Sequence, residues 1–389
     1  MNYAPAHVAY FDNNATTRVA PEVVEAMMPF FGESYGNPSS IYRFGGSVRR
    51  LVERAREQVA ALIGASPEEI VFTSCGSESD NMALKGFFQE RGGKTKIVTT
   101  AVEHPAVRST ARFLKGRGAD LTELPVDGEG MLSPSALGAL GIGPDTLVSA
   151  MWANNETGAV FPIKELAEAA KARGALFHTD AVQAAGKAVI DVRKVPIDML
   201  ALSGHKLHAP KGIGAAYFRA GAPIRAIIHG GHQEGGRRAG TENVPYIIGI
   251  GRACELAAGR MAEEDTRVRA MRDRLEGALL ARCAGAKLNG PPAARLPNTT
   301  NISFENIEGE AVLLHLDEAG IAASSGSACT TGALEPSHVM MAMGVPYSYA
   351  HSSIRFSLSV YNTEEEVDRV IAAMPGIVEK LRRLSPFVG

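Results

Sequence analysis

The chain has 389 residues, of which 45% are apolar and 21% charged, and its formal net charge is −2. This length and balance predict a globular protein of two or three domains. The near-neutral charge does not favour nucleic acid as a partner. No apolar run approaches the roughly 18 residues of a membrane span. The start of the chain lacks the layout of a signal peptide, and four cysteines make no disulfide framework, so a reducing cytoplasm is expected.

Strands and helices alternate through the middle of the chain. A helix capped by Ser47 is predicted to end at Gly64, with its apolar residues on one face. Further helices are expected after residue 75 and over 163–173. Strands are predicted over 70–73, 96–100, 146–152, 175–180 and 198–203. Such alternation is typical of a mostly parallel sheet that is covered by helices.

The pattern changes from about residue 255, which indicates a second domain. A charged helix is predicted over 263–282, followed by a Pro/Gly break. Strands are expected over 300–304 and 353–359, and a final helix from Thr363. We place the domain boundary near residue 258. No internal repeat or low-complexity tract is apparent.

Two neighbouring strands are expected to end on Asp180 and just before Lys206. Open α/β sheets bind ligands at the carboxyl ends of their strands. A lysine can hold the aldehyde of pyridoxal phosphate (PLP) as a Schiff base, and an aspartate can keep its pyridine nitrogen protonated. Alone, each residue could be an exposed charge or a helix cap, but together they predict a PLP site. The rival amines Lys85 and Lys211 are interpreted as structural.

A phosphate site is predicted where the strand at 70–73 gives way to a helix. Gly76 would let the backbone approach a phosphate, and Ser77 could donate its hydroxyl. Ser203 and His205, which flank Lys206, could donate to the same group. An ordinary capped helix is the alternative. The chain has no Gly-x-x-x-x-Gly-Lys loop, so a nucleoside triphosphate is not indicated.

Four further polar residues follow or lie within predicted strands. His104 could stack on a flat cofactor ring and carry protons, or simply bond to backbone. Amides at Asn155 and Gln183 could bond a cofactor oxygen or a substrate carboxylate. Arg355 suits the α-carboxylate of an amino acid, although a structural ion pair is an equal alternative.

Cys329 is the candidate nucleophile among the four cysteines. It lies among small and polar residues, in a segment predicted to be an exposed, mobile loop. An exposed thiol can ionise and attack. Cys254 and Cys283 are interpreted as buried apolar residues. Cys75 is the rival thiol, next to the predicted phosphate site.

Several histidines raise the possibility of a metal site. They lack the spacing of zinc motifs and have no cysteine companions, so no intrinsic metal is expected. These histidines are His205, His208, His229 and His232.

Motifs along nearly the whole chain resemble those of the cysteine desulfurases, relatives of the class V aminotransferases on the fold-type I PLP scaffold. The nitrogen-fixation (NifS-like) branch fits better than the housekeeping (IscS-like) branch. The motifs are Asp12-Asn-Asn-Ala-Thr-Thr, Gly36-Asn-Pro-Ser-Ser, Thr73-Ser-Cys-Gly-Ser-Glu-Ser, Glu103-His-Pro-Ala, Asn154-Asn-Glu-Thr-Gly, His178-Thr-Asp-Ala-Val-Gln, Ser203-Gly-His-Lys, Arg238-Ala-Gly-Thr-Glu-Asn and Ser325-Gly-Ser-Ala-Cys.

The resemblance implies an α/β fold whose large domain, over 15–258, contains a mostly parallel seven-stranded sheet. A smaller α+β domain would consist of 1–14 and 259–389 and carry the cysteine loop at about 323–335.

The resemblance also implies a role for each candidate residue. Lys206 would form the Schiff base, Cys329 would carry a persulfide, and His104 would stack on the ring and carry protons. Asp180 would pair with the pyridine nitrogen and Gln183 with the ring oxygen. Asn155 and Arg355 would hold the substrate carboxylate, with Asn155 also near the cofactor. The phosphate would be bound by Gly76, Ser77, Ser203, Gly204, His205 and Thr241, the last from the partner subunit of a homodimer.

The activity so implied is conversion of L-cysteine to L-alanine, with sulfur passing through Cys329 to an iron–sulfur scaffold protein, for instance in nitrogenase maturation. Cys329 would then contact a nascent iron–sulfur cluster transiently. Selenocysteine lyase or another class V aminotransferase is the alternative enzyme. A non-enzymatic sulfur carrier is the alternative from a different class.

Overall fold

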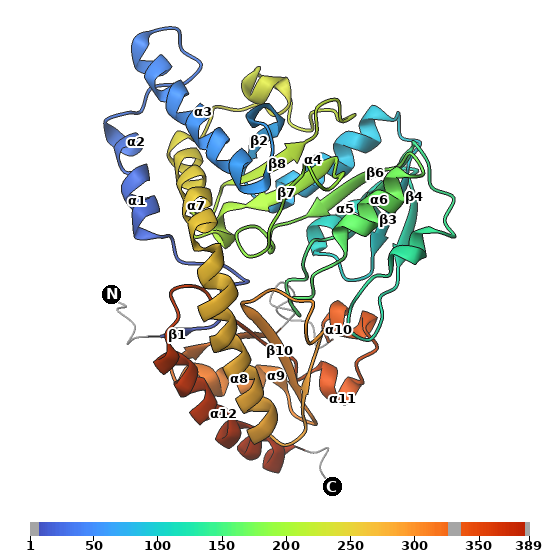
Figure 1. The fold of residues 1–389 in the computed structure, drawn as a ribbon, viewed down its shortest axis with the longest axis vertical. Coiled ribbons are helices and arrows are strands. Elements are labelled where there is room, and N and C mark those ends of the chain that lie inside the picture. Colours follow the sequence, from blue (N-terminus) through green and yellow to red (C-terminus); the bar gives the residue numbers. More distant parts are fainter. Residues whose placement is uncertain (1–7, 326–335, 386–389) are drawn as a thin grey trace.

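The structure is a computed structural model that describes residues 8–325 and 336–385. It has two lobes joined by one long helical path, which runs through α7 (Val244–Glu263), a π-helical turn (Glu264–Val268) and α8 (Arg269–Arg282) (Figure 1). None of the helices in these two ranges is long and apolar enough to cross a membrane.

The upper lobe in Figure 1 contains the predicted seven-stranded sheet. Only β8 is antiparallel to its neighbours, so the prediction of a mostly parallel sheet is confirmed. The strands are short and, except for the edge strand β4, almost wholly buried, as expected for a sheet covered on both faces. The strands in sheet order are β2 (Ile70–Thr73), β8 (Gly214–Phe218), β7 (Met199–Ser203), β6 (Leu176–Asp180), β5 (Thr146–Ser149), β3 (Lys96–Thr100) and β4 (Asp120–Leu124).

Helices cover both faces of this sheet because successive strand side chains point in opposite directions. Ile97 packs in the cluster formed with α4 and α5, whereas Val98 belongs to the cluster formed with α3, α6 and α7. The short helices α1 and α2 pack against α7 at the edge of the lobe. The helices are α1 (Pro21–Met27), α2 (Pro29–Gly32), α3 (Arg43–Ile63), α4 (Gly76–Glu90), α5 (Pro105–Lys115) and α6 (Ile163–Lys171).

The predicted start of the first long helix was wrong. Helix α3 begins at Arg43, and the Ser47 hydroxyl donates to the Phe44 carbonyl inside the helix instead of capping it. Gly45, in the first turn of the helix, lies so close to the Asn37 carbonyl that a Cβ would approach it to 2.4 Å, so this early turn requires glycine at that position. The end was predicted correctly, since Gly64 adopts the left-handed conformation at φ 69°.

In the described residues, the lower lobe combines an antiparallel sheet with five helices. Its four strands are β12 (Ser324–Ser325), β13 (Ile354–Ser357), β10 (Thr299–Phe304) and β9 (Ala286–Leu288). A separate parallel pair joins β1 (Ala9–Tyr10) to β11 (Ile321–Ala322). The helices are α8, α9 (Gly309–Glu318), α10 (His338–Ala342), α11 (Tyr347–Ala350) and α12 (Glu364–Leu384).

The N-terminal residues Ala9 and Phe11 pack in the apolar cluster of the lower lobe, with α8 and α12. Residue 258 lies within α7. The division of the chain into domains at that residue remains a prediction.

Candidate active site

A pocket of about 310 Å³ lies where the carboxyl ends of β6 and β7 meet the start of α4. Segments distant in the sequence contribute to it, including residues 14–15 and Arg355 of β13. The lining residues are Asn14, Ala15, Cys75, Gly76, Ser77, Asp80, His104, Met151, Ala153, Asn155, Asp180, Val182, Gln183, Ser203, His205, Lys206 and Arg355.

Lys206 ends a short 3-10 turn (Gly204–Lys206) that directly follows β7. Its Nζ donates to the carbonyls of Asn14 at 2.5 Å and Ala15 at 2.7 Å. The rival Lys85 lies on α4 with its Nζ over the ring of Phe113, and neither it nor Lys211 lines the pocket. Of the three candidate lysines, Lys206, which the sequence analysis predicted to bind the cofactor, is the one that lines the pocket.

Asp180, at the end of β6, is 7% exposed. Burial raises the pKa of its carboxyl, while His104, the Val182 N–H and Lys206 oppose the shift. Asp180 has no arginine partner among the described side chains, so its carboxylate would gain most from a buried cation in the pocket. A protonated pyridine nitrogen is such a cation.

His104 caps α5, and its Nδ1 accepts from the Ala106 N–H at 3.1 Å. This bond leaves Nε2 as the atom that can face a ligand. Burial lowers the pKa of the imidazole, so the ring is mainly neutral near pH 7. Atoms of His104, Asp180 and Asp80 lie within 4.8 Å of one another. This geometry could hold a metal ion, but the same side chains line the predicted position of the cofactor ring.

Four predicted phosphate ligands lie together at the start of α4. Gly76 is the first residue of the helix, and a Cβ there would meet Val182 Cγ2 at 2.7 Å. Ser77 is exposed beside it, and the buried Ser203 hydroxyl has no hydrogen-bond partner within the described chain. His205 Nδ1 lies 3.2 Å from Thr16 Oγ1, and burial lowers the pKa of its imidazole to about 4. Neutral donors at a helix N-terminus suit a phosphate dianion.

Gln183 lies between the N-terminal segment and the pocket. Its Nε2 donates to the Asn14 carbonyl at 3.0 Å, whereas its buried Oε1 has no partner within residues 8–325 and 336–385. An unsatisfied amide oxygen in a ligand pocket indicates a missing donor. Turning the amide over would aim its NH2 group at a ring oxygen, and would replace the present bond to the Asn14 carbonyl by a contact between two acceptor oxygens.

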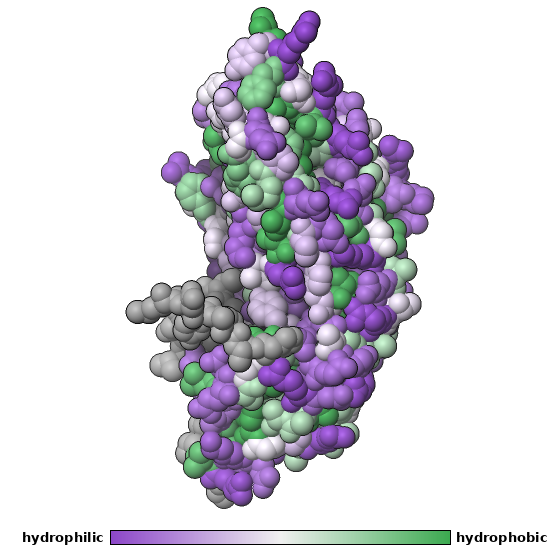
Figure 2. Space-filling view, turned by 90° about the vertical axis from the view of Figure 1, so that its left-hand side faces the viewer, coloured by the Kyte–Doolittle hydropathy of each residue, from purple (hydrophilic) through white to green (hydrophobic). Residues whose placement is uncertain are grey.

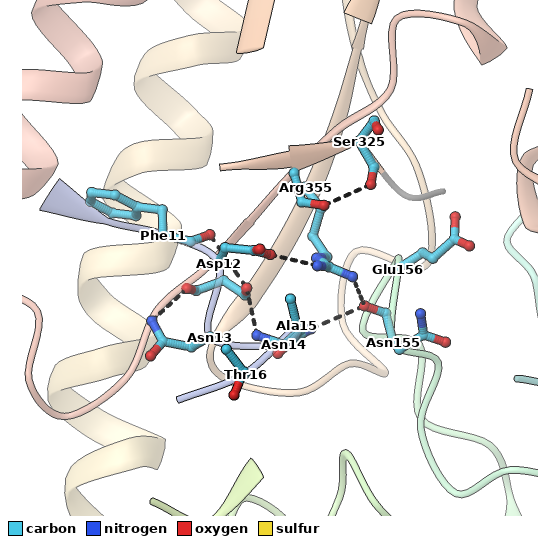
Figure 3. A network of polar contacts seen from close by, with 12 residues as sticks. Phe11, Asp12, Asn13, Asn14, Ala15, Thr16, Asn155, Glu156, Ser325 and Arg355 are labelled. Carbon is cyan, nitrogen blue, oxygen red and sulfur yellow. Dashed lines mark hydrogen bonds and ion pairs between the residues drawn. The ribbon is translucent and has the colours of Figure 1, made fainter. Parts of the chain in front are cut away.

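Arg355 is 2% exposed and is held from two sides (Figure 3). Its guanidinium donates to Asp12 Oδ1 at 2.6 Å and to the Asn155 carbonyl at 3.0 Å. The buried Nε–H has no partner in the described part of the chain. The structural ion pair, which the sequence analysis gave as an alternative, is therefore present, and the Nε–H is still available to a ligand.

Cys329 lies outside the described residues, so its predicted exposure and mobility remain expectations. The described residues on either side of it lie near residues of the pocket. Ser325 pairs with Ile354 in the β12–β13 ladder, next to Arg355. On the other side, His338 Nε2 bonds to the Glu103 carbonyl at 3.1 Å, one residue before His104.

The remaining thiols differ in environment. Cys254 and Cys283 are buried, as predicted, and burial raises their pKa values to about 12 and about 11. Cys75 is half-buried and lines the pocket.

Two predicted cofactor residues do not line the pocket of their own chain. Gly204 is buried in the turn before Lys206, where a Cβ would meet Ile213 Cγ2 at 2.8 Å. Thr241 is exposed, in a segment that Arg238 ties to Glu78 of α4 at 2.9 Å. The predicted role of Thr241 at the phosphate of a partner subunit remains a prediction.

The sequence reasoning gave no role to three residues at the site. Asn14 supplies the carbonyl that binds Lys206, and Asp12 holds Arg355. Both belong to the quoted Asp12 motif, which was the available signal. Asp80 lies buried on the inner side of α4, 3.4 Å from His178 Nε2. Nothing in its local sequence distinguishes it from other polar residues of a helix.

These features fit PLP. The pocket offers an amine, a buried carboxylate with no arginine partner among the described residues, a side-chain amide, and a hydroxyl beside a helix N-terminus that has no partner within the described chain. They match, in the same order, the aldehyde, the pyridine nitrogen, the ring oxygen and the phosphate of the cofactor.

The family model for class-V aminotransferases matches residues 9–370. The chain belongs to this family. It is 56% identical over 380 residues to a cysteine desulfurase of Trichormus azollae, which covers 98% of this chain and 95% of that protein. It is 54% identical over 379 residues to the cysteine desulfurase NifS of Azotobacter vinelandii, covering 97% and 94%.

Solved structures agree with this membership. A structure titled "NIFS-LIKE PROTEIN" matches with a TM-score of 0.89 and 41% identity, over 97% of this chain and all of that one (100%). A structure titled "SspA in complex with cysteine" matches with a TM-score of 0.80 and 36% identity, over 91% and 99%. This class-V aminotransferase is therefore a PLP-dependent enzyme of the cysteine desulfurase group. The predicted family, fold and cofactor are confirmed.

Proposed function

We propose that this enzyme converts L-cysteine to L-alanine and passes the sulfur to Cys329. The observation that carries the proposal is the meeting of Lys206 and Asp180 in one pocket with Arg355 at its rim. When bound through its aldehyde, PLP supplies an electron sink that acidifies the Cα proton of an amino acid. The residues of the chain must then hold the amino acid, move its protons and accept its sulfur.

Arg355 and Asn155 are proposed to bind the substrate α-carboxylate. The guanidinium is already oriented by Asp12 and by the Asn155 carbonyl (Figure 3). Its free Nε–H and the Asn155 side-chain amide would meet the two carboxylate oxygens. A preoriented fork of this kind loses little entropy on binding.

Lys206 is proposed to be both the attachment point of PLP and the base that takes the Cα proton. Its Nζ lies on the Asn14–Ala15 side of the pocket, held by two carbonyls. His104 is proposed to carry the proton of the substrate thiol or of Cys329. Its burial keeps the ring neutral and thus able to accept a proton.

Cys329 is proposed to attack the substrate sulfur as a thiolate. A new S–S bond forms while the Cβ–S bond breaks, and the electron pair left on Cβ takes up a proton to give the methyl group of alanine. The short length of chain between Ser325 and Cys329 supports this role. Cys329 is four positions after Ser325, which is at most about 14 Å of extended chain, and Ser325 lies in the ladder beside Arg355.

The test compares three variants for alanine and sulfide formation. Lys206→Ala should give no sustained turnover. Cys329→Ala should keep the absorption of bound PLP and its spectral response to L-cysteine, yet release no sulfide. Cys75→Ala, a thiol that also reaches the pocket, is the matched control and should retain sulfide release. Normal desulfuration by Cys329→Ala together with its loss in Cys75→Ala would mean that the wrong thiol was chosen.

A homodimer is part of the proposal. Large apolar side chains are exposed along α1, α2, the following loop and α3, and hydrophobic groups gather on the upper part of this face in Figure 2. Exposed apolar patches often take part in protein–protein contacts, so this surface supports the proposed dimer. Thr241 would reach the phosphate of the partner's cofactor. The exposed apolar residues are Val24, Met28, Phe31, Tyr35, Ile41, Tyr42, Phe44 and Leu51.

The sulfur acceptor is proposed to be an iron–sulfur scaffold protein, in the cytoplasm and in the service of nitrogenase maturation. The named NifS relative supports this branch of the family. Transfer of labelled sulfur from Cys329 to a purified scaffold protein would test it, and labelling that stays on the enzyme would oppose it.

A further inference from the structure

Glu156 is a buried carboxylate that the proposed chemistry does not use. It is 3% exposed and lies in the Asn154-Asn-Glu-Thr-Gly turn, directly after Asn155. The Asn154 side chain holds this turn by accepting from the N–H groups of Glu156 at 2.9 Å and Thr157 at 3.0 Å. The Glu156 carbonyl accepts from Asn301 Nδ2 of β10 at 3.2 Å. The backbone is thus fixed, and the carboxylate does not line the pocket.

The Glu156 side chain binds the residue before α10. Ser337 Oγ donates to Glu156 Oε2 at 2.5 Å and accepts from the Val339 N–H at 3.0 Å, which caps the helix. One hydroxyl therefore joins the substrate-binding turn to the start of α10. The neighbouring His338 bonds to the Glu103 carbonyl, so the same helix start also touches the turn that carries His104.

Ser337 and Ser325 lie on either side of the segment that contains Cys329. Ser337 lies eight residues after Cys329, and Ser325 lies four residues before it. The Ser325 end is set by the ladder beside Arg355. The Ser337 end is set by Glu156, next to Asn155. Both points from which the cysteine segment leaves the described chain are therefore held by immediate neighbours of Arg355 and Asn155, the residues proposed to bind the substrate carboxylate.

A carboxylate at this buried position has an energetic cost. Burial raises the pKa of Glu156 to about 7, and the Ser337 bond and the nearby Arg355 favour the ionised form. An apolar side chain could fill the same space without the cost of burying a charge. What the carboxylate provides and an apolar side chain could not is an acceptor for the hydrogen bond from the Ser337 hydroxyl.

We propose that Glu156 is a positioning residue for sulfur transfer: through Ser337 it fixes the start of α10 to the turn that carries Asn155. The inference rests on the proposed role of Cys329. It predicts that loss of the contact slows attack on the substrate sulfur while substrate binding is kept.

The experiment uses the PLP-loaded enzyme and four variants. Glu156→Met removes the acceptor at similar size, Ser337→Ala removes the donor, and the third variant combines them. Glu156→Gln is the conservative rescue, because its amide oxygen still accepts. Two quantities are measured: the L-cysteine concentration for half-maximal spectral change, and the single-turnover rate of alanine formation without added reductant. Thr363→Ala is the matched control, since Thr363 caps α12 in the same way, away from the pocket.

Glu156→Met and Ser337→Ala should each slow alanine formation about tenfold, with half-saturation changed less than about threefold. The double variant should be no slower than Glu156→Met, and Glu156→Gln and Thr363→Ala should stay within about threefold of the parent. Multiplying effects in the double variant, or a Glu156→Gln as slow as Glu156→Met, would overturn the inference. Parent-like rates in Glu156→Met would also overturn it, and if Cys329→Ala is then inactive the proposed function stands. Alanine formation by Cys329→Ala at the parent rate would remove the proposed function itself.

Discussion

Replacement of Arg355 by alanine tests the substrate-binding assignment most sharply. The guanidinium is 2% exposed, and its Nε–H is the donor that the described chain leaves unsatisfied. A hydrogen bond to a charged group contributes about 1.5–3 kcal/mol, and each 1.4 kcal/mol corresponds to about tenfold in affinity. The KM for L-cysteine should therefore rise roughly ten- to 150-fold. Steady-state alanine formation over a range of L-cysteine concentrations measures it.

Two controls separate this effect from general damage. Asp12→Asn keeps the guanidinium and its bond to the Asn155 carbonyl, so KM should change by less than about threefold. Arg274→Ala removes an arginine that pairs with Glu364 on the surface of the same lobe, and it should leave KM unchanged. An Arg355→Ala enzyme that retains PLP and its parent KM would refute the assignment.

Two further predictions concern stability and thiol reactivity. Burial raises the pKa of Glu103 to about 8, above the roughly 4.3 of an unfolded glutamate, so the folded enzyme retains a proton that the unfolded chain loses. Its contribution to stability therefore falls as pH rises between these values. Glu103→Gln should gain Tm relative to the parent on going from about pH 5 to about pH 8, and a constant difference would contradict this. A thiol reagent near pH 7 should leave Cys254 and Cys283 unmodified, because burial raises the pKa values of their thiols. Peptide mass spectrometry measures the labelling of each cysteine. Fast labelling of Cys254 or Cys283 in the folded enzyme would contradict the prediction.

Local sequence was sufficient for the parts of the site that follow strands. Asp180 and Lys206 could be placed at strand ends because each follows a short apolar run, and parallel strands bring such ends together. The helix at Gly76 was recognisable from its small residues after a strand. These features depend on residues that are close in the sequence, so they can be predicted without knowledge of the tertiary contacts.

Contacts between distant segments could not be predicted in this way. The Asp12–Arg355 pair joins residues 343 positions apart, and the Glu156–Ser337 bond spans 181. Their partners are set by how the two lobes pack, and no local periodicity encodes that. The start of α3 was missed for a related reason, since the close approach of Gly45 to Asn37 is visible only in the folded chain.

The most direct test of the account is reduction of the purified enzyme with borohydride, which makes a lysine–PLP imine permanent, followed by digestion and peptide mass spectrometry. The account predicts that the reduced cofactor mass is found on the peptide containing Lys206. Recovery of that mass on Lys85 or Lys211, with the Lys206 peptide unmodified, would contradict it.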